Sequence, residues 1–390
     1  MYRIAFVCDW DASNPSAMSG AAYSMRRALL EAGHEVLDVF PAERDALSRA
    51  AMVSGLFITS FFKLFGLYHS PKRETAYLKA AGLYTERKLR RLGQYDFVFS
   101  QSALPVGFAR ISKPIVFTTD QPFEAYIKGY VPNPSNRFLK IGRELETLLA
   151  NKCSLIIFPS QWAADEFLKT HIGAKPKVRV IQWGANLSAS PSREQVYESI
   201  KTRKSEKCLN LVFIGRDWER KGGQVAVDVA QKFHANGQDC KLTVIGTRAE
   251  IPDEIRGQVI PFIDKNTPDG IALLSTILSK SHFLIVPSRA EAYGHVFCEA
   301  AAFGVPSVST SVGGIPSIIT DGENGICLPV SSSAEAFYQR IKDIFADDQA
   351  YQTMATKAFS SFEERLSWKA FTASMLEGGQ RHFAGVARQK

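Results

Sequence analysis

Two carboxylates in the second half of the chain have a spacing that could serve chemistry. Glu291 and Glu299 lie eight positions apart in PSRAEAYGHVFCEAAAFGVPSVST, with Gly294 and His295 between them. The apolar stretch HFLIVPS predicts a buried strand that ends just before Glu291. The residues from about Gly294 onward predict a helix that carries Glu299. Either acid alone would ordinarily be a helix-bordering residue near an N-terminus.

The start of this predicted helix favours an anion, because its unpaired backbone N–H groups point outward. These groups belong to Tyr293, Gly294, His295, Val296 and Phe297. A carboxylate within the second turn would repel phosphate. It would accept hydrogen bonds from the vicinal hydroxyls of a sugar.

A second cluster is FIGRDWERKGG, in which a predicted strand ends at Gly215 and is followed by Arg216 and Lys221. The two glycines after Lys221 begin a predicted helix. Arginine offers a planar fork, lysine a point charge and the helix end its N–H groups, a combination that suits a diphosphate. A charged surface loop is the alternative interpretation. No Walker A loop is present.

Two further loops lie at predicted strand–helix junctions. In MSGAAYS, Ser19 and Gly20 open the first helix, and Gly20 permits close approach of a ligand to the backbone. This is not the GxGxxG of a dinucleotide site. In SVGGIPSIITDGENGICLP, Gly313 and Gly314 predict a turn, for which a plain strand–turn–strand is the structural alternative.

The elements that must position these residues alternate between short apolar strands and helices, which predicts βαβ units and parallel sheets. We expect an α/β fold of two doubly wound, Rossmann-like domains facing a cleft. The expected divisions are a first domain over 1–190, a linker over 191–207, a second domain over 208–365 and a terminal helix over 366–390 that crosses back to the first domain.

Composition is that of a globular protein of 390 residues with a net charge of +8. The whole excess falls in residues 1–190, where 24 Lys and Arg oppose 16 Asp and Glu. The six cysteines form no CxxC pair, which favours reduced thiols in a cytoplasmic protein over disulfides or a zinc site. The N-terminus predicts a strand, not a signal peptide.

The segment from Val53 to Arg91 interrupts the alternation. Its apolar beginning contains Lys63 and is shorter than the ~20 residues that span a bilayer, so we do not expect a transmembrane helix. From Lys63 to Arg91, eight basic residues face two acidic ones. This is either a solvated helical pair covering the sheet or a basic surface that binds anionic membrane.

Taken together, GRDWERKGG, the stretch from Pro287 to Ile319 and DGENGICLP resemble a family 4 glycosyltransferase of the GT-B fold, the group 1 glycosyl transferases. The spacings of Arg216 to Lys221 and of Glu291 to Glu299 match that family. SGAAYSMRRALLEAGHEV is similar to its glycine loop and first helix. The resemblance covers nearly the whole chain and is most specific over 211–330.

The resemblance implies a retaining transferase that uses a nucleotide diphosphate sugar, UDP- or GDP-linked, without a metal or other cofactor. Arg216 and Lys221 would hold the diphosphate and stabilise the leaving group. Glu291 would accept hydrogen bonds from the donor sugar and Glu299 from the ribose. The residues expected to complete the donor site are Ser19, Gly20, Gly215, Phe262, Ile263, Ala292, Tyr293, Gly294, His295 and Val296.

Two positions depart from the family pattern. Where the family often has a His-Asp pair facing the donor sugar, this chain has FTTDQPFEAY, so Thr119 or Asp120 takes that place and Asp120 is the expected catalytic contact. Ser19 stands where glycine is more common, which narrows backbone approach slightly. Neither Glu291 nor Glu299 is then expected to shuttle protons as in a glycosidase.

The acceptor is expected to be a glycan or a lipid-linked molecule in cell-envelope polysaccharide or glycolipid assembly, on the inner face of the plasma membrane. Two alternatives stay open: a sugar-nucleotide epimerase or phosphorylase of the same fold, and a non-catalytic sugar-nucleotide or polyanion binding protein. Nucleic acid is not expected as a partner, since no recognition motif accompanies the basic charge.

Overall fold

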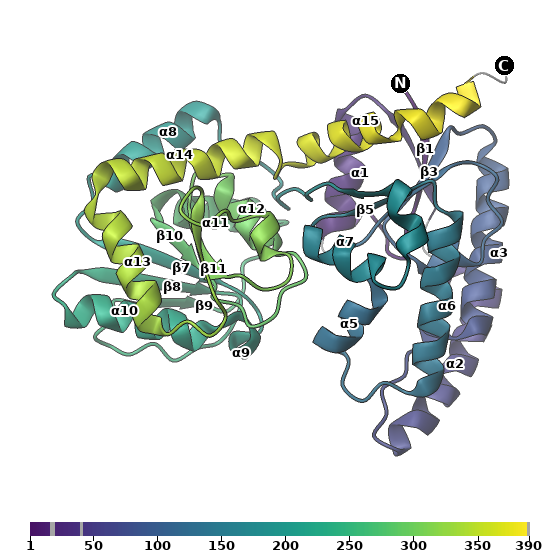
Figure 1. Ribbon diagram of the computed structural model, residues 1–390, viewed down its shortest axis with the longest axis horizontal. Helices are drawn as coiled ribbons and strands as arrows, with labels where there is room; N and C mark the ends of the chain where they lie inside the picture. The colour runs from purple at the N-terminus through teal and green to yellow at the C-terminus, as the bar shows by residue number, and fades with distance from the viewer. Residues whose placement is uncertain (16–19, 40–41, 388–390) are drawn as a thin grey trace. The chain divides into compact units, whose positions relative to one another are not determined.

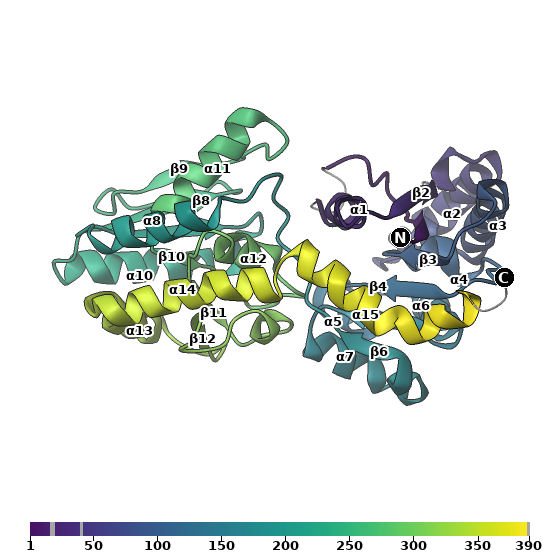
Figure 2. The same ribbon diagram turned by 90° about the horizontal axis from the view of Figure 1, so that it is seen from above.

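The computed structural model describes residues 1–15, 20–39 and 42–387. The chain divides into two compact units. Unit 1 comprises Met1–Ile181 and Thr372–Lys390, and unit 2 comprises Gln182–Phe371. Each has a parallel sheet of six strands with helices on both faces (Figures 1 and 2), so the expected α/β class with two doubly wound domains is confirmed.

In unit 1 the strand order is β2-β1-β3-β4-β5-β6. The strands β3, β4 and β5 are buried along their whole length, as expected for a parallel sheet covered on both faces. The elements are β1 (Arg3–Val7), α1 (Ala21–Glu31), β2 (Glu35–Val39), η2 (Ala42–Arg44), α2 (Ala46–Leu64), η3 (Pro71–Arg73), α3 (Thr75–Leu92), β3 (Phe97–Ser100), α4 (Leu104–Gly107), β4 (Ile115–Thr118), α5 (Phe123–Tyr130), α6 (Asn136–Lys152), β5 (Leu155–Phe158), α7 (Gln161–Leu168), η4 (Ile172–Lys177) and β6 (Val178–Val180).

In unit 2 the order is β12-β11-β10-β7-β8-β9, and Figure 1 shows α8, α12 and α14 on one face of the sheet with α10 on the other. The elements are α8 (Arg193–Lys204), β7 (Leu209–Ile214), α9 (Trp218–Lys221), α10 (Gly223–Ala235), β8 (Cys240–Ile245), β9 (Gln258–Ile260), α11 (Pro268–Lys280), β10 (Phe283–Ile285), α12 (His295–Ala301), β11 (Ser307–Thr310), η5 (Ile315–Ser317), β12 (Gly325–Leu328), α13 (Ala334–Ala346), α14 (Asp348–Glu364) and α15 (Trp368–Ala387). The last helix begins in unit 2 and continues into residues that group with unit 1.

The polar stretch 191–207, for which we expected a connection between domains, contains α8 and clusters with unit 2. Ser192 caps this helix in a capping box with Gln195. Val196 and Ile200 are buried, and the guanidinium of Arg203 donates to four backbone carbonyls, including Ser281 O at 3.0 Å and Gly304 O at 2.7 Å. A polar sequence therefore conceals one buried stripe and one interior cation, whose two terminal nitrogens are bonded and whose Nε has no hydrogen-bond partner among the described residues.

The segment after β2 forms two long helices, α2 and α3, which pack on each other. Helix α2 begins at Ala46, seven residues before the apolar run predicted from the sequence, because Asp45 caps it by accepting from Ser48 N–H. Among the described residues, α2 is the one helix long and apolar enough to cross a membrane by length and composition, and only 11% of that stretch is buried.

The loop after β11 depends on a glycine. Gly313 has φ of 54°, and a Cβ there would lie 1.8 Å from Glu291 O. Gly322 has φ of 77°, but a Cβ there would meet no atom within 4 Å. The two positions share the left-handed backbone and differ only in the space around them.

We therefore predict that Gly313→Ala lowers the free energy of unfolding of unit 2 by about 2 kcal/mol more than Gly322→Ala. Both variants lose about 1–2 kcal/mol to the left-handed backbone. Urea denaturation with the two variants side by side measures the difference. Equal losses would show that the loop relaxes around the new methyl group.

Candidate functional site

The second sheet reverses its strand order beside its first strand, β7. From there the chain proceeds to β8 and β9 on one side and to β10, β11 and β12 on the other. In open parallel sheets, ligands bind in the crevice outside the carboxyl ends of the strands at this switch point. The loops that begin there, after β7 and β10, carry Lys221 and Glu291.

These two loops are held together through their backbones. Arg289 N–H donates to Arg220 O at 2.7 Å, and a Cβ at Gly222 would lie 2.1 Å from Pro287 O. The loop after β11 joins them, because Gly314 N–H donates to Glu291 O at 3.2 Å. The positions of the side chains in these loops are therefore set by close main-chain packing.

Lys221 and Glu291 form an ion pair in which the ammonium donates to Glu291 Oε2. The two side chains are only 12% and 10% exposed. Arg220 Nη1 lies 3.9 Å from the same oxygen and donates to Ala290 O at 2.9 Å. The carboxylate of Glu291 thus faces two cations, a set that can meet both a phosphate and a sugar hydroxyl.

The second predicted carboxylate pairs with a different loop. Lys265 Nζ donates to Glu299 Oε2 at 2.5 Å, and the side chain of Glu299 is only 4% exposed. This contact joins α12 to the loop between β9 and α11. The same loop carries Phe262, which is 64% exposed, and the half-buried Ile263. An exposed aromatic on the loop that pairs with a buried carboxylate is a combination that suits a base and a ribose.

The stretch between the two acids turns its side chains inward. Tyr293 is buried, its hydroxyl donates to Trp183 O at 2.7 Å, and burial raises the pKa of its phenol. The ring of His295 stacks on that of Trp183 with centroids 5.6 Å apart, and its Nδ1–H donates to Gly184 O at 3.1 Å. Burial lowers the pKa of His295 to about 4, so the imidazole is neutral at pH 7.

Ala292, Tyr293 and Gly294 are buried, so the backbone is what they can offer a ligand, whereas His295 and Val296 are half-buried. Gly294 adopts φ of 101° and caps α12, and Ala292 is buried. The packing of both aromatic side chains explains why this stretch keeps a rigid path between Glu291 and Glu299.

The other predicted residues are distributed differently. Gly215 lies beside Lys221, because a Cβ at Gly215 would be 3.1 Å from Lys221 Cγ. Arg216 is exposed and has no ion pair within the described ranges. Gly20 caps α1 in the left-handed conformation and belongs to unit 1, whereas Ser19 lies outside the described residues.

Sequence reasoning missed Arg220 and the pairing partner of Glu299. Asp217 accepts from Arg220 N–H and from its Nε, both at 3.1 Å, which turns this arginine toward Glu291. The Asp-x-x-Arg spacing is the signal that could have indicated it. Within the parts of the chain that the structure describes, no group of three or more His, Cys, Asp or Glu residues could hold a metal ion.

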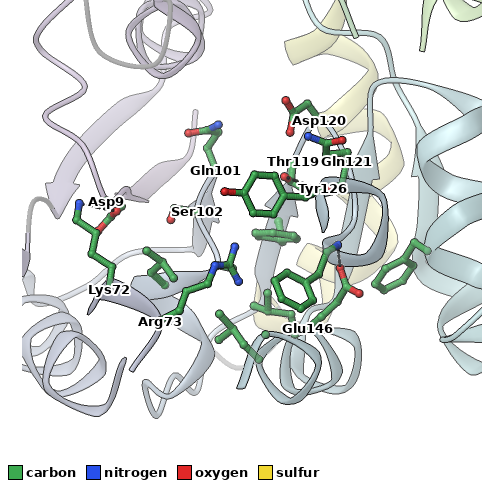
Figure 3. A pocket seen from close by; sticks show the side chains of 18 of the residues that line it. Asp9, Lys72, Arg73, Gln101, Ser102, Thr119, Asp120, Gln121, Tyr126 and Glu146 are labelled. Carbon is green, nitrogen blue, oxygen red and sulfur yellow. Dashed lines mark hydrogen bonds and ion pairs between the residues drawn. The ribbon is translucent and has the colours of Figure 1, made fainter. Parts of the chain in front are cut away.

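Unit 1 has a cavity of about 400 Å³ at the corresponding switch point, outside the carboxyl ends of β1 and β3 (Figure 3). Asp9 follows β1, Gln101 and Ser102 follow β3, and Thr119 and Asp120 follow β4. The structure thus places the predicted Asp120 on the wall of a pocket. Thr119, the alternative to Asp120 in the sequence analysis, lines the same pocket, whereas Asp9, Gln101 and Glu146 were not predicted.

The pocket has an incompletely compensated acid at one end. Lys72 donates to Asp9 Oδ2 at 3.3 Å and also pairs with Glu43. Asp9 is 3% exposed, its Oδ1 has no hydrogen-bond partner among the described residues, and burial raises its pKa. An orphaned buried acceptor is unusual and calls for a donor, such as a ligand hydroxyl.

A cation lies in the middle of the pocket. The guanidinium of Arg73 is 4.8 Å from the ring centroid of Phe123, 5.8 Å from that of Tyr126 and 5.6 Å from that of Phe138. No carboxylate of the described residues forms an ion pair with it, and burial lowers its pKa. Figure 3 shows it pointing between Lys72 and Tyr126. A half-buried cation that packs on ring faces and has no ion-pair partner among the described residues is stabilised further by an anion.

Glu146 closes the other end of the pocket. Its Oε1 accepts from Phe123 N–H at 2.7 Å, its side chain is 14% exposed, and burial raises its pKa to about 7. The folded protein therefore holds a proton on Glu146 at pH values where the unfolded chain has lost it. This stabilising contribution is fully present below the unfolded pKa of about 4.3 and is lost as the pH rises through 7.

We predict that Glu146→Gln is stabilising relative to the parent protein by up to about 3 kcal/mol at pH 8 and by much less at pH 5. The amide keeps the acceptor for Phe123 N–H and carries no charge at either pH. Chemical denaturation of both proteins at the two pH values tests this. A difference that does not change with pH would contradict the raised pKa.

Comparisons with known proteins cover both units. The family described as "Glycosyltransferase Family 4" matches residues 20–189, and "Glycosyl transferases group 1" matches residues 208–347. D-inositol 3-phosphate glycosyltransferase from Paenarthrobacter aurescens is 25% identical over 66% of this chain, and that from Corynebacterium diphtheriae is 24% identical over 62%. The matched regions span 64% and 61% of those relatives.

Two solved structures match over nearly all of both chains at 16% identity. Sucrose-phosphate synthase from Thermosynechococcus elongatus has a TM-score of 0.64 and covers 99% of this chain and 100% of its own. HepE from Anabaena, in complex with UDP and glucose, has a TM-score of 0.57 and covers 97% and 99%. These likenesses confirm the expected GT-B fold.

Proposed function

The chain belongs to glycosyltransferase family 4, and from that premise we propose that it moves a sugar from a nucleotide diphosphate sugar to a glycan or lipid-linked acceptor. The observation that carries this proposal is the pairing of Lys221 with Glu291 and of Lys265 with Glu299 at the switch point of unit 2. Two acid–base pairs on one edge match the two ends of one donor.

Donor binding would exchange partners within the first pair. A diphosphate brings negative charge to Lys221, and the exposed Arg216 follows the same strand, β7. Glu291 is then released to accept hydrogen bonds from sugar hydroxyls. In the resting protein the pair keeps both buried charges compensated, which avoids the cost of an isolated interior ion.

The same cations would serve the reaction. Breaking the bond between sugar and diphosphate leaves charge on a phosphate oxygen, and Lys221 and Arg216 stabilise that charge as it develops. Two cations would do the work that a metal ion does in other transferases, so we propose a metal-independent reaction. Retention of configuration and a UDP- or GDP-linked donor are carried over from the family.

The donor proposal predicts that Lys221→Ala abolishes the stabilisation of unit 2 by the donor and lowers kcat/KM about 100-fold or more. The measurement is the shift in thermal unfolding across UDP-, GDP- and dTDP-sugars, followed by turnover with the best donor. Lys232→Ala is the matched control. Lys232 forms an ion pair with Glu335, with Nζ and Oε2 2.6 Å apart, and this pair does not belong to the candidate site. Full donor protection of Lys221→Ala would refute the assignment.

Removing Lys221 also leaves Glu291 without its main counter-ion. The double variant Lys221→Met with Glu291→Gln therefore separates folding from function: it should unfold at nearly the parent temperature and still fail to bind donor. If Lys221→Ala lost donor binding only because it was unfolded, the folded double variant would bind the donor.

We propose that the pocket of unit 1 holds the polar end of the acceptor. Arg73 offers a cation to an acidic group, the orphaned oxygen of Asp9 accepts from a hydroxyl, and Asp120 contacts the acceptor or donor sugar. The positive excess of residues 1–190 supports an anionic acceptor, as in cell-envelope polysaccharide or glycolipid assembly. We place this step in the cytoplasm, at an anionic membrane surface.

This acceptor proposal predicts that Arg73→Gln raises the acceptor KM at least 10-fold and leaves the donor KM unchanged. Arg143→Gln is the control, because Arg143 is exposed and pairs with Glu124 at 2.6 Å on the same unit. Steady-state kinetics with each substrate varied in turn separates the two constants. A change in the donor KM alone would place the acceptor elsewhere.

A further inference from the structure

Helix α2 carries its apolar side chains on the outside. Ala50, Val53, Phe57, Phe61 and Leu64 recur at intervals of three and four residues, which places them on one face of the helix. We call these five residues the α2 stripe. Phe57 is 74% exposed, Phe61 56% and Leu64 81%, and Phe65, just past the helix, is 65% exposed.

The opposite face of α2 is already used. Ser48 and Gly55 are buried, and a Cβ at Gly55 would lie 2.9 Å from Pro71 O. Ala51 and Met52 pack against the buried cluster of Tyr77, Ala81 and Tyr84 with Ala42. The helix is therefore anchored to unit 1 by its small residues, and it cannot leave that position without exposing a buried core.

Single exposed apolar side chains are normal on protein surfaces, but a contiguous row of large ones marks an interaction site. In Figure 1, α2 lies along the outer edge of unit 1. One face of α2 packs on unit 1, so the helix cannot be surrounded by lipid on all sides. Its exposed face is therefore suited to lying on a membrane rather than crossing one.

The charges of α2 indicate which surface it meets. The helix contains no Asp or Glu, and its two charged residues are Arg49 and Lys63, fourteen residues or about 21 Å apart. Both are exposed, and the helical period places them on the same side of the α2 stripe. Cations beside an apolar face fit the phosphates of anionic lipids above their acyl chains.

The basic surface predicted from Lys63–Arg91 is smaller in the structure than in the sequence. Lys72 pairs with Asp9 and Glu43, Arg73 points into the pocket, and Arg87 pairs with Asp45 at 3.1 Å. Charge alone is therefore a poor membrane anchor here, and the apolar residues must carry most of the contact.

We infer that α2 docks unit 1 on an anionic lipid bilayer by inserting the α2 stripe among the acyl chains, with Arg49 and Lys63 at the headgroups. The partner is the lipid surface itself. The inference rests on the proposed function in one respect: docking would bring the pocket of unit 1 to a lipid-linked acceptor. Vesicle binding requires neither donor nor acceptor, so the two proposals fail separately.

The test is co-sedimentation of the full-length protein with vesicles of phosphatidylcholine containing 30% phosphatidylglycerol. The double variant Phe57→Ser with Phe61→Ser should bind at least 10-fold more weakly. Its thermal unfolding midpoint should not fall, since both rings are largely exposed. Leu83→Ser, which alters a 48% exposed leucine on α3 of the same unit, is the matched control and should bind like the parent.

Two further measurements locate the contact. In Phe57→Trp, the emission added to that of the five native tryptophans should shift to shorter wavelengths on binding and be quenched by lipids brominated in their acyl chains, relative to the parent protein under the same conditions. Arg49→Gln with Lys63→Gln should weaken binding to the anionic vesicles at least threefold and leave weak binding to pure phosphatidylcholine unchanged.

Three results would overturn the inference. One is failure of the parent protein to bind these vesicles, and another is equal binding by the Phe57 and Phe61 double variant. The third is that the parent binds no vesicles but self-associates in sedimentation without them, and that the double variant does not self-associate. This result would make α2 an interface between copies of this chain. If the parent protein binds the vesicles but has no transferase activity, that result would instead count against the proposed reaction.

Discussion

The candidate donor site depends on close packing of main chains at the carboxyl edge of the second sheet. Three loops meet there with no room for a side chain at Gly222 or Gly313, whose backbones press against Pro287 O and Glu291 O. Because the loops are locked through their peptide groups, their side chains remain available for a ligand. Lys221 and Glu291 can then face each other as a buried pair, which is tolerable only while each compensates the other.

The two units place charged side chains at the same position of a doubly wound sheet but pair them differently. At the switch point of unit 2 the opposite charges are paired, so a ligand must exchange partners with them. In the pocket of unit 1 the pairing is incomplete: Arg73 is held by aromatic faces, and Asp9 keeps an unpartnered oxygen. Such a site carries an unfavourable energy that a ligand with both an acidic group and a hydroxyl would relieve.

Local sequence patterns predicted the strand–helix alternation and the residues that follow β7 and β10, because strand ends and glycine turns are local features. Contacts between distant loops were not predictable in this way. Nothing near Glu299 indicates that Lys265 is its partner, and nothing near Arg73 indicates a pocket. The 191–207 stretch looked like a linker because Val196, Ile200 and Arg203 are the buried side chains among the α8 residues whose burial the structure describes. Composition averages conceal a helix with one narrow buried stripe.

The same reasoning changes how the positive charge of the first half should be interpreted. Net charge counts every lysine and arginine equally, but Lys72 and Arg87 are paired with carboxylates of unit 1 and Arg73 packs against aromatic rings. Arg73 is a cation directed at a pocket, where low polarity strengthens its attraction for an anion. Arg49 and Lys63, by contrast, are exposed beside an apolar face and are screened by salt. The positive excess therefore has two roles. Arg73 attracts an anion inside the pocket, whereas Arg49 and Lys63 contribute a weaker attraction at the surface, where apolar contact must dominate.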